Sequence, residues 1–248
     1  MVSSLTTISF YDLEWDTEFF GINCAKAVLH SSLTPMEWNE LQSKFSNSQF
    51  ISITNLNSDP VNAQLIGKNT SAFLADINIQ FVKKQSGTHE LPENITIHRS
   101  LERNDQIIKI ADFKYSKFTE DPELAKRNGN QVYQQWLLNA FEKQDRYFAL
   151  SRDEKEDING FVLFSIQDNA CVIELIAVSP KVTQGGIGTR LFKSVEYVSH
   201  KEGINEIKVG TQIRNLGAIN FYHRMGCKQV GCHQVYHLWN KKINKGEF

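Results

Sequence analysis

The sequence has little of what builds a disulfide framework or a membrane span. Its 248 residues include four cysteines, scattered at Cys24, Cys171, Cys227 and Cys232. So few and so widely spaced cysteines do not form a disulfide framework. No stretch approaches the roughly 18 uninterrupted apolar residues that a membrane span requires. The first residues also lack a basic segment followed by an apolar run, which argues against a secretory signal. We therefore expect a cytoplasmic protein with no membrane partner.

An excess of charge of either sign is also missing. Lysine and arginine together number 27 and aspartate and glutamate 28, so the formal net charge is −1. Without a dense basic block, the sequence predicts no field that would attract nucleic acid or an anionic membrane. It does contain 41% hydrophobic and 22% charged residues, a composition typical of a globular protein with a sizeable core.

Two cysteines and two histidines near the end of the sequence are possible ligands of a metal ion. Cys227, Cys232, His233 and His237 lie close together in the stretch CKQVGCHQVYHLW. The alternation of this stretch favours β-structure, in which the neighbours Cys232 and His233 point to opposite faces and do not converge on one ion. We therefore predict reduced thiols and histidines in a pair of strands, and no metal.

The polar stretch 83–94 divides the sequence. It contains Gly87 and Pro92, follows a strand-like segment at 75–82, and is predicted to be a linker. Before it, a strand-like run at 50–56 and a helix that starts near Thr34 and Pro35 indicate a small α/β unit. The predicted domains are therefore a small N-terminal α/β domain, residues 1–90, and a larger domain, residues 95–242.

The larger domain begins with strands and then alternates strands with helices. Such an order predicts an α/β (α+β) fold in which a mixed central sheet is flanked by helices. The expected strands lie at residues 95–101, 146–152, 158–166, 171–178 and 205–211, followed by closing strands at 227–239. The expected helices lie at 104–113, 128–143 (with Val132, Trp136, Leu137 and Ala140 at helical spacing), after Gly188, and at 215–225.

A glycine cluster stands between the fourth of these strands and the helix that follows it. Gly185, Gly186 and Gly188 precede apolar residues at helical spacing, Ile187, Leu191, Val195 and Val198. Free backbone N–H groups and the positive end of the helix dipole hold an anion at such a junction, and glycines let the anion approach closely. The alternative is a glycine-rich turn with no ligand.

Two common phosphate sites do not fit this cluster. A nucleoside triphosphate loop requires Gly-Lys-Ser/Thr, whereas the sequence has Gly188-Thr189-Arg190. A dinucleotide site requires Gly-x-Gly-x-x-Gly, but Leu191 occupies the place of the third glycine. It also needs an acidic residue at the end of the next strand, which ends instead on Gly210-Thr211. Coenzyme A is the third possibility.

Two motifs resemble the GNAT acyltransferase superfamily. LIAVSPKVTQGGIGTRLF (residues 175–192) is similar to its acyl-coenzyme A loop, and NLGAINFYHRMGC (215–227) matches its Asn-x-x-Ala-x-x-x-Tyr-x-x-x-Gly pattern. The motifs stand in the order that the family has, about 30 residues apart. The family often has Arg or Gln where this sequence has Thr183, with Gln184 one place later. This departure indicates that backbone amides contribute more to phosphate binding.

The resemblance implies acetyl-coenzyme A as the acyl donor. The glycine turn would hold its pyrophosphate, the backbone of the preceding strand its pantetheine arm, and a family asparagine would contact it as well. A strand N–H group could also stabilise the oxyanion. The residues implied as cofactor-binding are Ile176, Val178, Gln184, Gly185, Gly186, Gly188, Thr189 and Asn215.

Two residues are implied in the chemistry. Tyr222 matches the family's general acid, which protonates the departing thiolate; the reference pKa values of phenol and thiol, about 10 and 8.5, permit the transfer. The alternative for Tyr222 is core packing. Glu174, on the strand before the glycine turn, is either the base for the amine, directly or through water, or a salt-bridged strand residue, and solvent could also take the proton.

A narrower resemblance concerns the acceptor. The stretches WDTEFFGIN (15–23), VYQQW (132–136) and KVGTQIRNLGA (208–218) look like sugar-nucleotide N-acetyltransferases of the dTDP-fucosamine type. This group implies a small N-terminal domain before the acetyltransferase domain, a homodimer, and a nucleotide-linked amino-dideoxy sugar used for surface polysaccharide synthesis. Tyr133 and Gln212 are the residues expected to bind the sugar nucleotide. The alternatives are another amine (an amino acid, a peptide N-terminus or a small molecule) and a non-catalytic module that binds coenzyme A.

Overall fold

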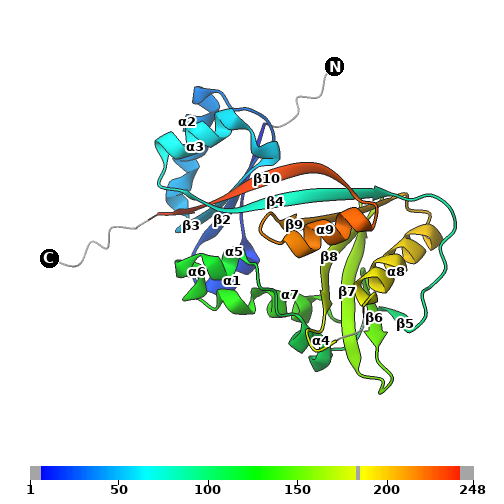
Figure 1. Cartoon of the computed structure of the whole chain (residues 1–248). Coiled ribbons are helices and arrows are strands. Elements are labelled where there is room, and N and C mark those ends of the chain that lie inside the picture. Colours follow the sequence, from blue (N-terminus) through cyan, green and yellow to red (C-terminus); the bar gives the residue numbers. More distant parts are fainter. Residues whose placement is uncertain (1–6, 183–184, 241–248) are drawn as a thin grey trace. The chain divides into compact units, whose positions relative to one another are not determined.

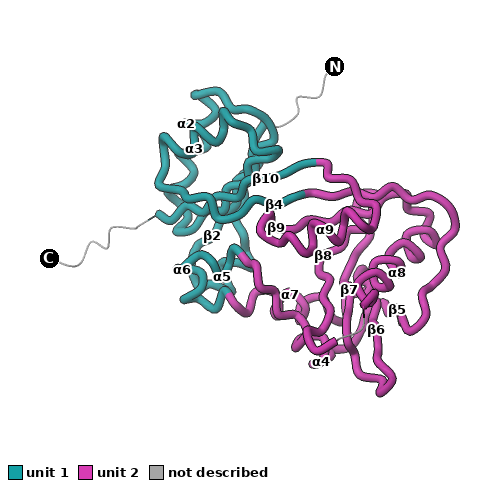
Figure 2. Tube along the Cα trace, viewed as in Figure 1, with its two compact units in different colours: residues 1–79, 117–129, 231–248 teal, residues 80–116, 130–230 magenta. Residues whose placement is uncertain are grey.

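The computed structural model describes residues 7–182 and 185–240. Their contacts divide the chain into two compact units, drawn in two colours in Figure 2. Unit 1 takes its residues from 1–79, 117–129 and 231–248, and unit 2 from 80–116 and 130–230. The predicted domains 1–90 and 95–242 stay a prediction, because contacts define compact units and not independently folding domains.

Unit 1 is a small sheet with helices on both faces. Its strands β1 (Ile8–Asp12), β2 (Cys24–Leu29) and β3 (Phe50–Asn55) are followed in the sheet by parts of β10 (Lys228–Trp239) and β4 (Phe73–Lys84). Helices α2 (Pro35–Lys44) and α3 (Pro60–Asn69) lie on one face, and α1 (Glu14–Phe20), α5 (Lys117–Glu120) and α6 (Pro122–Ala125) on the other (Figure 1). The predicted start of α2 is confirmed: the Thr34 hydroxyl accepts from the Glu37 N–H, and the Glu37 side chain accepts from the Thr34 N–H.

One carboxylate ties the second face of unit 1 together. Asp121 Oδ2 accepts from Trp239 Nε1 at 3.0 Å and lies 2.7 Å from His237 Nδ1. Burial raises the pKa of Asp121, but the hydrogen bonds with His237 and Trp239 outweigh burial and leave that pKa below its ordinary value. The two side chains come from β10, a single long strand where a pair of strands was predicted. Cys232 and His233 contact Ser58 and Asn57, and the described residues hold no group of three metal-ligating side chains.

Unit 2 is the predicted mixed sheet flanked by helices, and that prediction is confirmed. From the part of β4 that belongs to this unit, the order is β9 (Glu206–Gln212), β8 (Ala170–Val178), β7 (Ile158–Gln167), β6 (Arg146–Arg152) and β5 (Ile95–Arg99). Strands β5 to β8 are antiparallel, and β8 and β9 are parallel. Helices α4 (Asp105–Ile110) and α7 (Val132–Ala140) pack on one face, and α8 (Ile187–Lys201) contacts the sheet through β6, β7 and β8 (Figure 1). Helix α9 (Leu216–Arg224) follows β9.

The helices differ from the prediction mainly at their ends. Helix α4 stops at Ile110, short of the predicted 113, and α7 covers only 132–140 of the predicted 128–143. Of the four residues noted at helical spacing in α7, Val132, Leu137 and Ala140 are buried, but Trp136 is 39% exposed. Helices α1, α3, α5 and α6 and strands β1 and β2 were not predicted. Asp59 and Pro60 nevertheless give α3 a normal start signal, because the Asp59 side chain accepts from the Asn62 N–H.

A single glycine lets α8 lie close to the sheet. A Cβ atom at Gly160 on β7 would stand 2.9 Å from Ile187 Cγ2 and 3.1 Å from Leu191 Cδ1. The apolar residues predicted for α8 are buried. The first turn of α8 therefore rests directly on β7, next to the end of β8, and this contact fixes where the helix begins.

Candidate active site

Strands β8 and β9 part and leave a cavity between them. The two strands pair from Ala170 and Glu206 to Ile173 and Val209. Beyond these pairs β8 continues to Val178 and β9 to Gln212. The cavity has a volume of ≈ 640 Å³, and all of its lining residues belong to unit 2. Peptide groups of β8 that face this opening lack a strand partner in β9, so a ligand can pair with them.

A β-bulge lies where the strands part. Leu175 pairs with Leu163 and Ile173 pairs with Phe164, so Glu174 is the extra residue on β8. A bulge re-aims side chains and increases local twist. Here it turns two consecutive side chains towards α7: Leu175 joins the core cluster that contains Leu137, and Glu174 bonds to Trp136.

The Glu174 carboxylate has charged and polar neighbours. Trp136 Nε1 donates to Oε2 at 3.1 Å, and Arg146 Nε lies 3.0 Å from Oε1. The geometry of this Nε–Oε1 contact does not make a hydrogen bond, so the two groups form an ion pair only. The side chain is 7% exposed and its Oε1 is sealed from solvent. A salt-bridged strand residue was one of the alternatives predicted for Glu174, and the structure contains that salt bridge, with Arg146. Its role as a base stays a prediction.

The glycine turn opens helix α8 beside the cavity. Gly186 is the N-cap, at φ 90°, a conformation in which glycine is favoured, and no side chain in the described ranges 7–182 and 185–240 caps the helix. Gly188 lines the cavity, and a Cβ there would lie 3.4 Å from the Phe221 ring. The N–H groups of the first turn, which includes Thr189, are therefore available to an anion. Gln184 and the neighbouring Thr183 lie outside the described residues.

Arg190 adds a positive charge to this turn. Its Nη1 atom is 3.6 Å from the point that a Cβ of Gly186 would occupy. Its Nε atom is buried and has no hydrogen-bond partner within the described part of the chain. Arg190 was not among the predicted site residues, because Gly188-Thr189-Arg190 was compared only with Gly-Lys-Ser/Thr, in which Thr189 takes the place of the lysine. An arginine in the first turn of the helix was the signal.

Tyr222 and Asn215 belong to α9 and its N-terminus. Tyr222 is 3% exposed, packs between the rings of Phe81 and Phe221, and lines the cavity. Burial raises the pKa of Tyr222 far above its ordinary value, with a smaller contribution from Cys227, so the phenol keeps its proton. Asn215 also lines the cavity, and its Oδ1 caps α9 by accepting from the Ala218 N–H at 3.1 Å.

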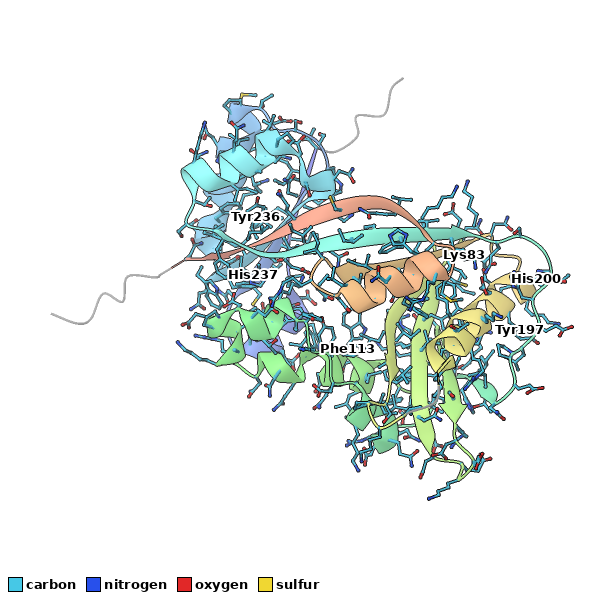
Figure 3. All side chains as sticks on the ribbon, viewed as in Figure 1. Lys83, Phe113, Tyr197, His200, Tyr236 and His237 are labelled. Atoms are coloured by element: carbon cyan, nitrogen blue, oxygen red, sulfur yellow. The ribbon has the colours of Figure 1, made fainter. Side chains whose placement is uncertain are left out.

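Aromatic side chains also line the cavity. Gln212 Nε2 donates a long hydrogen bond of 3.4 Å to the Tyr133 hydroxyl. The Tyr133 ring packs on the Phe113 ring, with the ring centroids 4.8 Å apart. Phe113, labelled in Figure 3, and Tyr115 lie in the segment after α4. Neither residue was predicted, because the sequence of an irregular segment does not indicate which part of the fold its side chains contact.

The structure brings most of the predicted residues to one cavity. Gly185, Gly186 and Thr189 belong to the turn beside it. Those that line it are Tyr133, Glu174, Ile176, Val178, Gly188, Gln212, Asn215 and Tyr222.

Part of the sequence is similar to known proteins. Residues 106–227 match the acetyltransferase (GNAT) family. The spore coat polysaccharide biosynthesis protein SpsD of Bacillus subtilis (strain 168) is 26% identical over 133 residues, which cover 54% of this chain and 46% of SpsD. The chain spans about half the length of the curated relatives it matches.

Two solved structures share the fold. A GCN5-related N-acetyltransferase from Sphaerobacter thermophilus has a TM-score of 0.61 at 14% identity, with 94% of this chain and 76% of that one covered. A functionally unknown conserved protein from Staphylococcus epidermidis ATCC 12228 has a TM-score of 0.64 at 15% identity, with 96% and 93% covered.

Replacing Arg190 tests the anion site. We expect Arg190→Gln to weaken the binding of coenzyme A about tenfold, because it removes a charge-assisted contact to phosphate at the helix start. Lys193→Gln removes the same charge from an exposed position of the same helix and is the matched control. Titration calorimetry measures both. Equal affinities for the two variants would place the anion elsewhere.

Proposed function

We propose that this chain, whose residues 106–227 form an acetyltransferase domain of the GNAT family, transfers an acetyl group from acetyl-coenzyme A to an amine. We propose further that the amine belongs to a nucleotide-linked amino-dideoxy sugar of the dTDP-fucosamine kind, made for a surface polysaccharide. The observation that carries the first proposal is the cavity between β8 and β9, which has the glycine turn beside it and Tyr222 in its wall.

The donor fits this cavity in one direction. Its pyrophosphate would lie at the turn formed by Gly185, Gly186 and Gly188, where helix N–H groups and Arg190 supply positive potential. Its pantetheine arm would extend along the free edge of β8, where the backbone at Ile176 and Val178 lines the cavity. The thioester would then lie near the bulge at Glu174, between the two strands.

The reaction needs a hydrogen-bond donor to the oxyanion and a proton donor to the leaving thiolate. The amine nitrogen attacks the thioester carbonyl, the C–N bond forms, and the carbonyl oxygen gains charge that a β8 N–H group would stabilise. As the C–S bond breaks, the Tyr222 hydroxyl would donate a proton to the sulfur. The raised pKa of Tyr222 keeps that hydroxyl protonated at neutral pH. The proton lost by the amine passes to water, directly or by way of Glu174.

The support for a sugar acceptor comes from the likeness to SpsD and from the aromatic lining of the cavity. SpsD is named for spore coat polysaccharide biosynthesis. Tyr133, Phe113 and Tyr115 line the cavity, together with Gln212. Aromatic faces and an amide suit the apolar face and hydroxyls of a sugar or the ring of a base. The homodimer and the cytoplasmic location stay predictions; no helix among the described residues is long and apolar enough to cross a membrane.

Removal of the Tyr222 hydroxyl tests the chemistry. We expect Tyr222→Phe to slow turnover by about 10²–10⁴-fold, the usual contribution of a general acid, while acetyl-coenzyme A still binds. Tyr147→Phe deletes the same atom from a buried tyrosine that bonds to Glu202, and is the control. Stopped-flow thiol detection with calorimetry separates rate from binding. An undiminished kcat would remove Tyr222 from the mechanism.

Thiol release across a panel of acceptors tests the function. The panel holds dTDP-linked amino-dideoxy sugars, other nucleotide-linked amino sugars, amino acids, peptides and simple amines. We expect turnover with the dTDP-linked amino-dideoxy sugars. Turnover confined to amino acids, peptides or simple amines would retain acetyl transfer and reject the sugar. If acetyl-coenzyme A binds and no amine is acetylated, the proposed enzyme is contradicted and a binding module is favoured.

A further inference from the structure

Helix α7 touches both of the strands that part. Trp136 Nε1 donates to Glu174 Oε2 on β8 at 3.1 Å, and the Tyr133 hydroxyl accepts from Gln212 on β9 at 3.4 Å. Tyr133 and Trp136 are one helical turn apart, and their rings are stacked, with an interplanar angle of 15° and centroids 6.4 Å apart. One rigid element therefore contacts each side of the opening.

We propose that Tyr133 and Trp136 of α7, with Glu174 of β8 and Gln212 of β9, form a clip that sets the width of the acceptor end of the cavity. In this assignment Glu174 is a positioning residue: it anchors β8 to α7 and does not take the proton of the amine. The kinetic consequences of the clip rest on the proposed acetyl transfer, whereas its contacts do not.

The surroundings of Glu174 favour an anchor over a base. Its Oε1 atom is sealed from solvent, so an amine in the cavity does not reach it, and Oε2 already accepts from Trp136. Arg146, with a side chain 20% exposed, stands 3.0 Å from Oε1. The carboxylate therefore has one oxygen buried beside a guanidinium group and the other bonded to α7, which is the arrangement expected of an anchor.

The bulge explains why an anchor is needed at this point. Glu174 is the residue without a partner on β7, and the ladder between β8 and β9 ends one residue before it, at Ile173. At Glu174 the strand has therefore lost both neighbours, and its side chain supplies the missing attachment through Trp136 and Arg146. On β9 the corresponding attachment is made at Gln212, the last residue of the strand.

The clip is testable without any activity. The chain has four tryptophans, so the indole N–H region of a ¹H–¹⁵N spectrum is simple, and Trp136→Phe assigns the signal of Trp136. We expect Glu174→Ala to move that signal strongly and Glu174→Gln, which retains an acceptor oxygen, to move it less. The signal of Trp239, bonded to Asp121, is the internal control. A Trp136 signal that Glu174→Ala leaves in place would overturn the clip.

Kinetics then separate an anchor from a base. We expect Trp136→Phe, which retains a ring and deletes the N–H, to raise the acceptor KM about fivefold with the acetyl-coenzyme A KM within about twofold. Trp136→Phe combined with Tyr133→Phe should raise the acceptor KM by less than the product of the two single increases, because both changes loosen the same clip. Glu174→Gln should slow turnover less than about tenfold and keep the shape of the pH profile of kcat.

The opposite result would be equally clear. If Glu174→Gln slows turnover by roughly two orders of magnitude or more and abolishes the acid limb of the pH profile, Glu174 is the base and its assignment as an anchor is overturned. If the wild-type chain acetylates no amine, the proposed function fails while the indole signal still decides whether the clip exists.

Discussion

Strands β8 and β9 share backbone hydrogen bonds only from Ala170 to Ile173, and the peptide groups beyond must find other partners. An unpaired backbone group away from water costs about as much as a lost hydrogen bond. A parallel pair that separates inside a sheet is therefore stable only if something occupies the gap. In this chain the gap is a cavity of ≈ 640 Å³, which we propose is filled by an extended ligand. An arm with alternating amides, as in coenzyme A, meets the requirement of the strand edge.

The surrounding elements hold that opening in place from separate directions. Gly160 allows the first turn of α8 to rest on β7, which puts the glycine turn at one end of the free edge. Asn215 caps α9 and so orients the helix that carries Tyr222 into the wall. At the start of α8, Arg190 and the helix N–H groups supply positive charge beside the cavity.

The sequence predicted the residues of the glycine turn and of α9 that the structure brings to the cavity, and it missed two aromatic residues of the cavity wall, for physical reasons. Gly186, Gly188, Asn215 and Tyr222 lie in local motifs, where a turn, a helix cap and a helix follow one another along the chain, and local order is readable from local residues. Phe113 and Tyr115 reach the cavity from an irregular segment, and the ion pair of Glu174 with Arg146 joins two strands that are not neighbours. Such contacts depend on tertiary packing. Strand β10 was split in two for a related reason, since Gly231 in its middle reads as a turn although the strand continues through it.

We propose that the free edge of β8 binds the acyl donor through its backbone, and hydrogen exchange of the β8 amides measures such binding directly. We expect acetyl-coenzyme A to slow the exchange of amides within residues 174–178, while the exchange of the amides of β6, inside the sheet, changes little. Binding of acetyl-coenzyme A, verified by calorimetry in the same sample, without slower exchange at 174–178 would contradict the claim and place the donor outside the opening between β8 and β9.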